Sequence, residues 1–304
     1  MKKILVIGSL NMDLVTHVPH LPIPGETIHS TKFQKSPGGK GANQAVAAAK
    51  LGGDVAMIGR VGSDDHGQVL VNNLKAAGVD ITGIQESGTT GMAFINVSTD
   101  GENNIVLVHG ANGQVNRADI YQFLHMIKNC EMIIMQLEIP LDVVEYVVDL
   151  AAEFKKKVLL NPAPAQQLTE GMLRKVHTLI PNETELEQIT GMPVATMEQV
   201  AAAAHKLQSN GVARIIVTLG DKGSYLVNEE LEVHIPAEKV TPVDTTAAGD
   251  SYIAAFAVGL TKGMSDVEAA KFATKVAAIV VTKEGAQPSL PTLEEVGEQL
   301  QSRP

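Results

Sequence analysis

The sequence predicts an α/β fold, a three-layer α/β/α sandwich with a mostly parallel central sheet and a small β-sheet lid. Three observations support this prediction. Short apolar runs alternate along the chain with longer helical patterns. Polar or glycine-rich segments follow several of these runs, at the edge where open α/β sheets bind ligands. Two segments, residues 13–36 and 91–109, contain alternating β-prone residues without an intervening helix, and they could form the lid.

Hydrophobic periodicity predicts strands at residues 4–7, 55–58, 132–137, 158–160, 177–180 and 214–218. It predicts helices at residues 41–51, 66–77, 118–128, 141–154, 183–190, 197–209, 249–261 and 266–283. Asp, Thr or Asn stands near the start of several helices, where its side chain can cap free amides. Since no Gly/Ser linker, charge block or internal repeat divides the chain, we expect one domain over residues 1–304, with lid segments at 13–36 and 91–109.

Composition excludes some classes of function. The chain of 304 residues has a formal net charge of −10 and no Trp, which is unsuited to nucleic acid binding. No stretch approaches the roughly 18 apolar residues of a membrane-spanning helix. Cys130 is the only cysteine, so no intrachain disulfide can form and a reducing compartment is favoured. We therefore expect a cytoplasmic protein without nucleic acid or membrane partners.

The strongest local signal is the segment Asp244-Thr-Thr-Ala-Ala-Gly-Asp-Ser-Tyr252, which leads into an apolar helical run. The amides of Ala247, Ala248 and Gly249 can point at a phosphate from the helix N-terminus, and their small side chains let it approach. Asp250 lies in the first helical turn, where the helix dipole favours an ionised carboxylate that can accept a hydroxyl proton. The alternative is an ordinary helix start with a favourable acidic residue.

A second glycine-rich motif, Ser36-Pro-Gly-Gly-Lys-Gly-Ala-Asn-Gln44, leads into an alanine-rich helix. Lys40 and Asn43 could bind the hydroxyl groups of a polyol, or the glycines could form only a tight turn. Asn11 and Asp13 follow the first strand, and Glu138 follows the run 132–137. Their polar side chains suit sugar hydroxyls, and turn formation is the alternative role.

The segment Asn182-Glu-Thr-Glu185 follows a strand and could hold hydrated Mg²⁺ between phosphates through Asn182 and Glu185. Helix capping by Asn182 is the alternative explanation. The nine histidines show no convincing metal-binding spacing, so none is assigned to catalysis.

In sequence order, these segments resemble motifs of the ribokinase family of carbohydrate kinases along nearly the whole chain. The resemblance rests on Gly8-Ser-Leu-Asn-Met-Asp13, Pro37-Gly-Gly-Lys-Gly-Ala-Asn-Gln44, Gly110-Ala-Asn112, Asn161-Pro-Ala-Pro-Ala165, Pro181-Asn-Glu-Thr-Glu185, the segment 244–250 and Gly285-Ala-Gln-Pro-Ser289. It implies a ribokinase-like fold and ATP-dependent phosphorylation of the 5-hydroxyl of D-ribose, with Asp250 as the base. Tyr252 stands where Phe is more usual in the family.

The resemblance also implies the remaining site residues. The sugar would contact Asn11, Asp13, Gly39, Lys40, Asn43, Glu138 and Asp250. ATP would contact Asn182, Glu185, Thr218, Leu219, Gly220, Asp221, Lys222, Gly223, Ala247, Ala248, Gly249 and Thr274, the last near the adenine. A monovalent cation, usually K⁺, would be held by oxygens of Asp244, Thr246, Val280, Lys283, Gly285 and Ser289. The family further implies a homodimer that forms through the lids.

Other functions stay open at this point. A deoxyribokinase, a fructokinase-like enzyme or a nucleoside kinase could share the scaffold, although aromatic residues that stack on a base make up only 3% of the chain. A nicotinamide-dependent oxidoreductase is disfavoured because no GxGxxG follows the first strand. A sugar sensor without catalysis is disfavoured by the intact Asp250 and its small-residue loop.

Overall fold

The structure is a computed structural model, and it describes residues 4–301. Within that range the main sheet has nine strands in the spatial order β13-β12-β11-β10-β9-β8-β1-β4-β5. Neighbouring strands from β11 to β5 are parallel, whereas β12 is antiparallel to both β11 and β13. The strands are β1 (Ile4–Ile7), β4 (Val55–Val61), β5 (Asp80–Glu86), β8 (Met132–Met135), β9 (Lys157–Leu160), β10 (Thr178–Leu179), β11 (Arg214–Thr218), β12 (Ser224–Asn228) and β13 (Glu232–Ile235).

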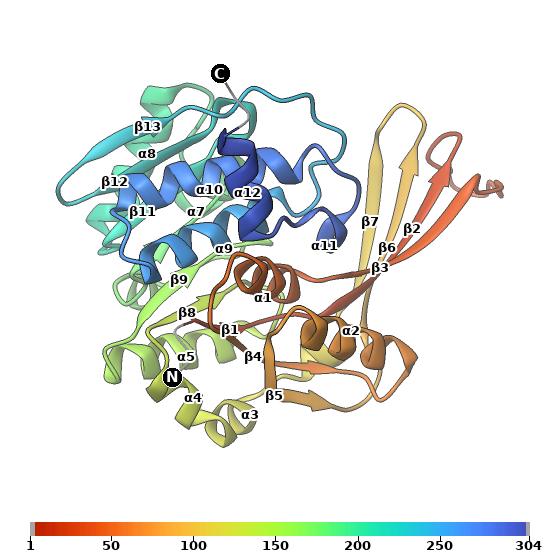
Figure 1. Cartoon of the computed structure of the whole chain (residues 1–304), viewed down its shortest axis with the longest axis horizontal. Helices are drawn as coiled ribbons and strands as arrows, with labels where there is room; N and C mark the ends of the chain where they lie inside the picture. Colours follow the sequence, from red (N-terminus) through yellow and green to blue (C-terminus); the bar gives the residue numbers. More distant parts are fainter. Residues whose placement is uncertain (1–3, 302–304) are drawn as a thin grey trace.

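A second sheet projects from one side of the body, as Figure 1 shows. It consists of β2 (Asn11–Val18), β3 (Lys32–Gly38), β6 (Gly91–Ser98) and β7 (Asn103–Val108), in the order β3-β2-β6-β7. Strands β2 and β6 pair in parallel, and β3 and β7 pair with them antiparallel. These strands lie in or overlap the two segments in which the sequence predicts extra β-structure.

The two faces of the main sheet are covered by different helices, because successive residues of a strand point to opposite faces. Ile4 and Val6 of β1 pack in one buried cluster, and Leu5 and Ile7 pack in the other. The first cluster is covered by α1 (Lys40–Lys50), α2 (Asp65–Ala76), α9 (Ala248–Thr261), α10 (Asp266–Val280) and α12 (Leu293–Gln301). The second is covered by α3 (Arg117–Gln122), α4 (Leu124–Asn129), α5 (Leu141–Glu153), α6 (Glu170–Leu173), α7 (Glu183–Thr190) and α8 (Met197–Ser209). The predicted three-layer sandwich with a small separate sheet is therefore confirmed.

Short elements complete the chain: the 3₁₀ turns η1 (Gly110–Gln114) and η2 (Gly220–Lys222), and α11 (Ala286–Ser289). Among the described residues, no helix combines the length and apolar character needed to cross a membrane.

Several predicted boundaries differ from the structure. The helix predicted at 118–128 is two helices, because Phe123 leaves helical geometry at φ −106° and ψ 23°. Strand β8 ends at Met135 rather than at residue 137, and α10 ends at Val280 rather than at residue 283. Strands β5, β12 and β13 and helices α6, α11 and α12 had no counterpart in the predicted set.

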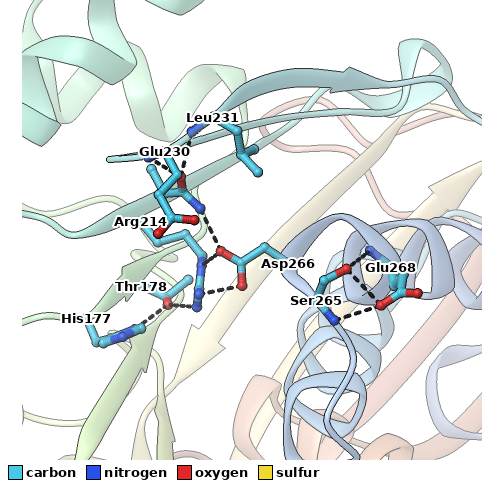
Figure 2. Close-up of polar contacts among 9 residues, drawn as sticks. His177, Thr178, Arg214, Glu230, Leu231, Ser265, Asp266 and Glu268 are labelled. Carbon is cyan, nitrogen blue, oxygen red and sulfur yellow. Dashed lines mark hydrogen bonds and ion pairs between the residues drawn. The ribbon is translucent and has the colours of Figure 1, made fainter.

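A buried ion pair ties α10 to the amino-terminal edge of the main sheet (Figure 2). Arg214, the first residue of β11, donates from Nε (2.7 Å) and Nη2 (2.5 Å) to the two carboxylate oxygens of Asp266, the first residue of α10. Asn228 donates to the same carboxylate (2.7 Å), and Arg214 also donates to the Thr178 hydroxyl (3.2 Å). The pair fixes α10 at the edge of the sheet that lies away from the strand ends where the candidate site forms.

Candidate active site

The two glycine-rich motifs meet at the carboxylate of Asp250. Helices α1 and α9 pack side by side, and Asp250 in the first turn of α9 is only 7% exposed. Asn43 Nδ2 donates to Asp250 Oδ2 (2.9 Å), and Gln44 Nε2 donates to Asp250 Oδ1 (2.9 Å). A negative charge is therefore held at the amino-terminal end of a helix, where the dipole favours it.

The amino-terminal end of α9 forms the predicted anion cradle only in part. Ala247 precedes the helix in the left-handed region, with φ at +62°. The Ala248 amide is not free, because it donates to the Thr245 carbonyl oxygen (3.2 Å). A Cβ built on Gly249 would meet no atom within 4 Å, so there is open space beside the backbone of the first turn. The cradle therefore suits an anion at Gly249 more directly than at Ala248.

The residues assigned to the sugar gather between the ends of β1 and β8, the start of α1 and the small sheet. Ser9 Oγ donates to Glu138 Oε2 (2.5 Å), and the Lys40 backbone amide donates to the same oxygen (3.3 Å). Asn11 Oδ1 accepts from Asn112 Nδ2 (2.7 Å), which leaves the amide group of Asn11 available. The side chains of Ser9, Asn11, Asn112 and Glu138 thus lie in one mostly buried polar region.

The charges in this region influence one another. Burial lowers the pKa of Lys40, but the carboxylates of Asp250, Glu138, Glu185 and Asp13 outweigh it and raise that pKa above its usual value. Burial raises the pKa of Asp13 to about 7, and the charges of Glu138 and Asp250 add to this while Lys40 opposes it. The site is therefore a desolvated acidic cluster around one ammonium group. Hydroxyl donors of a sugar would satisfy such carboxylates well.

Glycines in the first motif make this crowding possible. A Cβ at Gly38 would lie 2.1 Å from Asp13 Oδ2. A Cβ at Gly39 would lie 2.6 Å from the backbone nitrogen of Asn11, and Gly39 also has φ at +88°. No other residue fits at Gly39 without strain, so the glycine both starts α1 and lets β2 approach.

Of the residues assigned to the nucleotide, Asn182, Glu185 and the turn at residues 218–223 lie beside one another at the ends of β10 and β11. Asn182 and Thr218 form a parallel bridge, and the Thr218 amide donates to the Pro181 carbonyl oxygen (2.9 Å). Leu219 and Gly223 close the turn around η2, which contains Gly220 and Asp221, through a hydrogen bond of 2.8 Å. Lys222 Nζ donates to Glu183 Oε1 (3.2 Å) and ties this turn to α7.

Asn182 and Glu185 form the capping box that the sequence offered as the alternative to a metal role. Asn182 Oδ1 accepts from the Glu185 amide (2.8 Å), and Glu185 Oε2 accepts from the Asn182 amide (2.9 Å). Burial raises the pKa of Glu185, an effect that Asp250 reinforces, whereas the Asn182 amide and Lys40 oppose it. Both side chains are already engaged, so any Mg²⁺ here would be held through water.

Thr274 is buried in α10, and its hydroxyl donates to the Ala270 carbonyl oxygen (3.0 Å). Its side chain also forms a hydrogen bond with Tyr252 of α9. Its polar contacts are thus within the protein, and a role beside the adenine would depend on its methyl group and backbone. Helix α10 also carries Val280, which ends it.

The residues assigned to a monovalent cation form a connected loop. Asp244 Oδ1 accepts from the Thr246 amide (2.8 Å) and hydroxyl (2.6 Å), and Asp244 Oδ2 accepts from the Gly285 amide (2.8 Å). Burial favours the neutral form of Asp244, but these hydrogen bonds outweigh it and lower its pKa. The Val280 carbonyl oxygen accepts from the Lys283 amide (3.1 Å), and the Ser289 hydroxyl donates to the Ala286 carbonyl oxygen (2.6 Å). The ionised Asp244 and the carbonyl groups around it fit a cation with oxygen ligands.

Three buried polar residues near the site had no role in the sequence prediction. Ser9 holds Glu138, Asn112 holds Asn11, and Gln136 donates to Gln44 Oε1 (2.5 Å). Asn112 lies in a motif that the sequence singled out, and Ser9 lies in another. Gln136 had no signal beyond its place at the end of an apolar run, because its partner is distant in sequence.

Comparisons with known proteins identify the same family of carbohydrate kinases as the sequence motifs. The family model described as pfkB family carbohydrate kinase matches residues 1–293. A ribokinase of Haemophilus influenzae is 41% identical over 99% of both chains, and a deoxyribokinase of Salmonella typhi is 41% identical over 98% of both. The structure of Arabidopsis thaliana ribokinase complexed with ribose and ATP matches with a TM-score of 0.92, at 34% identity and with all of both chains covered. The family resemblance inferred from the motifs is thereby confirmed, and this chain belongs to the pfkB family of carbohydrate kinases.

Proposed function

We propose that this protein transfers the γ-phosphoryl group of ATP to the 5-hydroxyl of D-ribose, giving D-ribose 5-phosphate and ADP. The observation that carries the proposal is the position of Asp250. Its carboxylate lies in the first turn of α9, beside the open backbone at Gly249, and interacts electrostatically with Asp13 and Lys40. A phosphate at the helix start and a hydroxyl held by the acidic cluster would both be within reach of this one base.

In the proposed reaction the 5-hydroxyl oxygen attacks the γ-phosphorus in line with the leaving oxygen. The hydroxyl proton passes to Asp250, and the bond between the γ-phosphorus and the bridging oxygen breaks to release ADP. Asn43 and Gln44 hold the two carboxylate oxygens, and each oxygen keeps a further lone pair for the proton. Backbone amides at the start of α9 would stabilise the charge that develops on the transferred group.

Asn11, Asp13, Gly39, Lys40, Asn43 and Glu138 would orient the sugar. Burial and neighbouring carboxylates make Asp13 a strong acceptor for sugar hydroxyls once it is ionised. Glu138 is already aligned by Ser9 and the Lys40 amide. The arrangement supports recognition by many hydroxyl contacts rather than by an apolar pocket.

The turn at residues 218–223 and the start of α7 would bind the nucleotide, with Thr274 beneath it in α10. Mg²⁺ would supply charge neutralisation between the phosphates, and Asn182 and Glu185 would hold it through water, since their oxygens already accept hydrogen bonds. A monovalent cation such as K⁺ would order the loop before α9. Asp244 and the nearby carbonyl groups fit it, because hydrogen bonds keep that carboxylate ionised.

A deoxyribose substrate is the second candidate, because relatives with both names are equally similar to this chain. A site built to bind a hydroxyl rejects an analogue that lacks it by about 10⁴- to 10⁵-fold. Comparing kcat/KM for D-ribose and 2-deoxy-D-ribose therefore separates the candidates. D-fructose and adenosine complete the panel.

A homodimer through the small sheet belongs to the same proposal. By register, Phe33, Phe94, Val106 and Val108 lie on the face of this sheet opposite to Asp13, and all four are exposed. Contiguous exposed apolar side chains favour a protein interface. Sedimentation of Phe94→Asp against the unmodified protein tests it. A location in the cytoplasm stays a prediction, which rests on the single cysteine.

The proposed activity is tested by ADP release with Mg²⁺ and ATP across the sugar panel, with K⁺ and then with Na⁺. Asp250→Asn should lower kcat by at least about 100-fold while sugar still binds, because positioned general-base catalysis contributes about 10²- to 10⁴-fold. Near-normal turnover in Asp250→Asn would contradict the role of Asp250. If turnover requires a sugar other than D-ribose, the proposed substrate is wrong and the proposed mechanism stands.

A further inference from the structure

Two chains of side-chain amides end in hydrogen bonds to the carboxylate of Asp250. On one side Gln136 Nε2 donates to Gln44 Oε1 (2.5 Å), and Gln44 Nε2 donates to Asp250 Oδ1 (2.9 Å). On the other side Gln287 Nε2 donates to Asn43 Oδ1 (3.0 Å), and Asn43 Nδ2 donates to Asp250 Oδ2 (2.9 Å). The second chain includes Asn43, which is already assigned to the sugar, whereas the first runs through Gln44 and Gln136, neither of which is assigned to the sugar or the nucleotide.

Gln44 and Gln136 are both completely buried, at 0% exposure. A buried amide retained so deep in a core needs every hydrogen bond it can make. The second N–H of Gln44 points toward Asn161 Oδ1 (3.5 Å), so both ends of the Gln44 amide are engaged. A residue needed only for packing at this position would be served as well by an apolar side chain.

The direction of this chain is fixed by chemistry. An ionised carboxylate only accepts hydrogen bonds, so the nitrogen of Gln44 must face Asp250 and its oxygen must face Gln136. Gln136 then has to present its own nitrogen, which turns Gln136 Oε1 toward Gly8. That oxygen is the one buried side-chain polar atom without a hydrogen-bond partner among residues 4–298, whose side chains the structure describes. A Cβ at Gly8 would lie 2.0 Å from it, so the absence of a side chain there makes room for Gln136.

We infer that Gln44 is a positioning residue that fixes the orientation of the Asp250 carboxylate, and that Gln136 acts through it by fixing the polarity of the Gln44 amide. This inference rests on the proposed function, because it takes Asp250 as the base. Gln44 is completely buried, so we expect no direct contact between it and the sugar or the phosphate. Its effect is therefore on the chemical step and not on sugar binding.

The test uses the full chain with Gln44→Met and Gln136→Met, which keep side-chain length and remove the amide. For Gln44→Met we expect kcat to fall about 10- to 100-fold, as misplacement of a catalytic group does. The sugar dissociation constant should change less than about threefold. A fall in kcat without a matching loss of sugar affinity is the result that a purely structural role would not give. Lys40, Asp13 and Glu185, the charged groups that interact with Asp250, are unchanged in these variants.

Tyr252→Phe is the matched control. It removes buried hydrogen bonds from the same helix, with the hydroxyls of Ser224 (2.8 Å) and Thr274, without contact to the carboxylate. All variants are compared at saturating ATP, because Thr274 is assigned to the nucleotide. Gln136→Met should lower kcat less than Gln44→Met does, again with little change in the sugar dissociation constant. The double variant should match Gln44→Met alone, since Gln136 acts only through Gln44.

Different results overturn the inference and the proposed function. If Asp250→Asn is inactive but Gln44→Met and Gln136→Met match Tyr252→Phe in kcat and in sugar dissociation constant, the positioning role is wrong and the base stands. If Asp250→Asn turns over normally, the base is wrong and the positioning role is overturned with it. Should Gln44→Met not fold, Gln136→Met decides by the same two readouts.

Discussion

Asp13 should make the ligand-free protein less stable as pH rises, and Asp13→Asn should remove this effect. Burial, helped by Glu138 and Asp250, raises the pKa of Asp13 from 3.8 to about 7 in the folded protein. The unfolded chain therefore releases this proton first as pH rises from about 4, and the folded protein releases it only near pH 7. In this window the folded state binds more protons than the unfolded state, so the free energy of unfolding falls with pH.

The size of the effect follows from the shift. A difference of about 3 pKa units, at about 1.4 kcal/mol per unit, is about 4 kcal/mol. Asn has the same shape without the charge. The difference in unfolding free energy between Asp13→Asn and the unmodified protein should grow in favour of the variant up to about pH 8 and be constant above it. For a chain of 304 residues, about 4 kcal/mol corresponds to about 6 °C in Tm.

Urea unfolding of both proteins at half-unit steps from pH 5 to pH 8.5, without sugar, measures this difference. Taking the difference cancels the titration of groups that the two proteins share. Asp64→Asn is the control of opposite sign. Burial raises the pKa of Asp64, but hydrogen bonds from Thr90 and the Gly67 amide outweigh this and lower it. Because this carboxylate is ionised in both the folded and the unfolded state above about pH 5, Asp64→Asn should be less stable than the unmodified protein by an amount that stays constant from pH 5 to pH 8.5. A difference for Asp13→Asn that is flat across this range would refute the reasoning.

Three further predictions concern the sugar, the glycine turn and the buried ion pair. The sugar dissociation constant should rise about tenfold per pH unit as pH falls below 7, because binding through ionised Asp13 must release its proton. Calorimetry in buffers of different ionisation enthalpy checks this, and a dissociation constant that does not change from pH 5.5 to 8.5 would contradict it. Gly39→Ala should lower the free energy of unfolding by at least about 1–2 kcal/mol because of the positive φ, and by more because its Cβ would clash with β2. Gly297→Ala on α12, where a Cβ would meet no atom within 4 Å, should not destabilise the protein, and chemical unfolding of both variants compares them. Arg214→Met leaves the mostly buried Asp266 carboxylate with the Asn228 amide but without a counter-charge, and it should lower the free energy of unfolding by about 3 kcal/mol. In the same samples kcat should stay within about twofold, and a large loss of turnover would show that the pair also serves the site.

Much of the fold could be predicted from the sequence because helical and strand periodicities are local. Strands β1 and β11 and helices α7 and α8 have the predicted bounds. Strands β12 and β13 were missed because an antiparallel extension at the end of a parallel sheet has no signature beyond two short runs. The break at Phe123 was missed because the apolar pattern continues through both α3 and α4.

The candidate site was predicted where its motifs are contiguous, and not where they depend on distant contacts. Asn43 and Asp250 lie in separate motifs, and their hydrogen bond joins residues that are 207 positions apart. Periodicity could not show that contact, and the family resemblance assigned both residues to the sugar without predicting that they bond to each other. Gln136 could not be predicted at all, because its role depends on the orientation of another amide and on a glycine that leaves room for it.

The glycines of the first motif explain why a site this crowded can form. Gly38 and Gly39 each let another segment approach closer than any side chain would allow, and so does Gly41, where a Cβ would lie 2.6 Å from the Ser9 amide nitrogen. The approach brings Asp13 and Glu138 into a desolvated region around Lys40, and that raises the pKa of Asp13. The instability of the empty site is then a consequence of the same packing that prepares it for a polyol, because sugar hydroxyls can supply the hydrogen bonds that burial removes from these carboxylates. If this argument holds, saturating sugar should stabilise the unmodified protein well above pH 7 more than it stabilises Asp13→Asn, as thermal unfolding would measure.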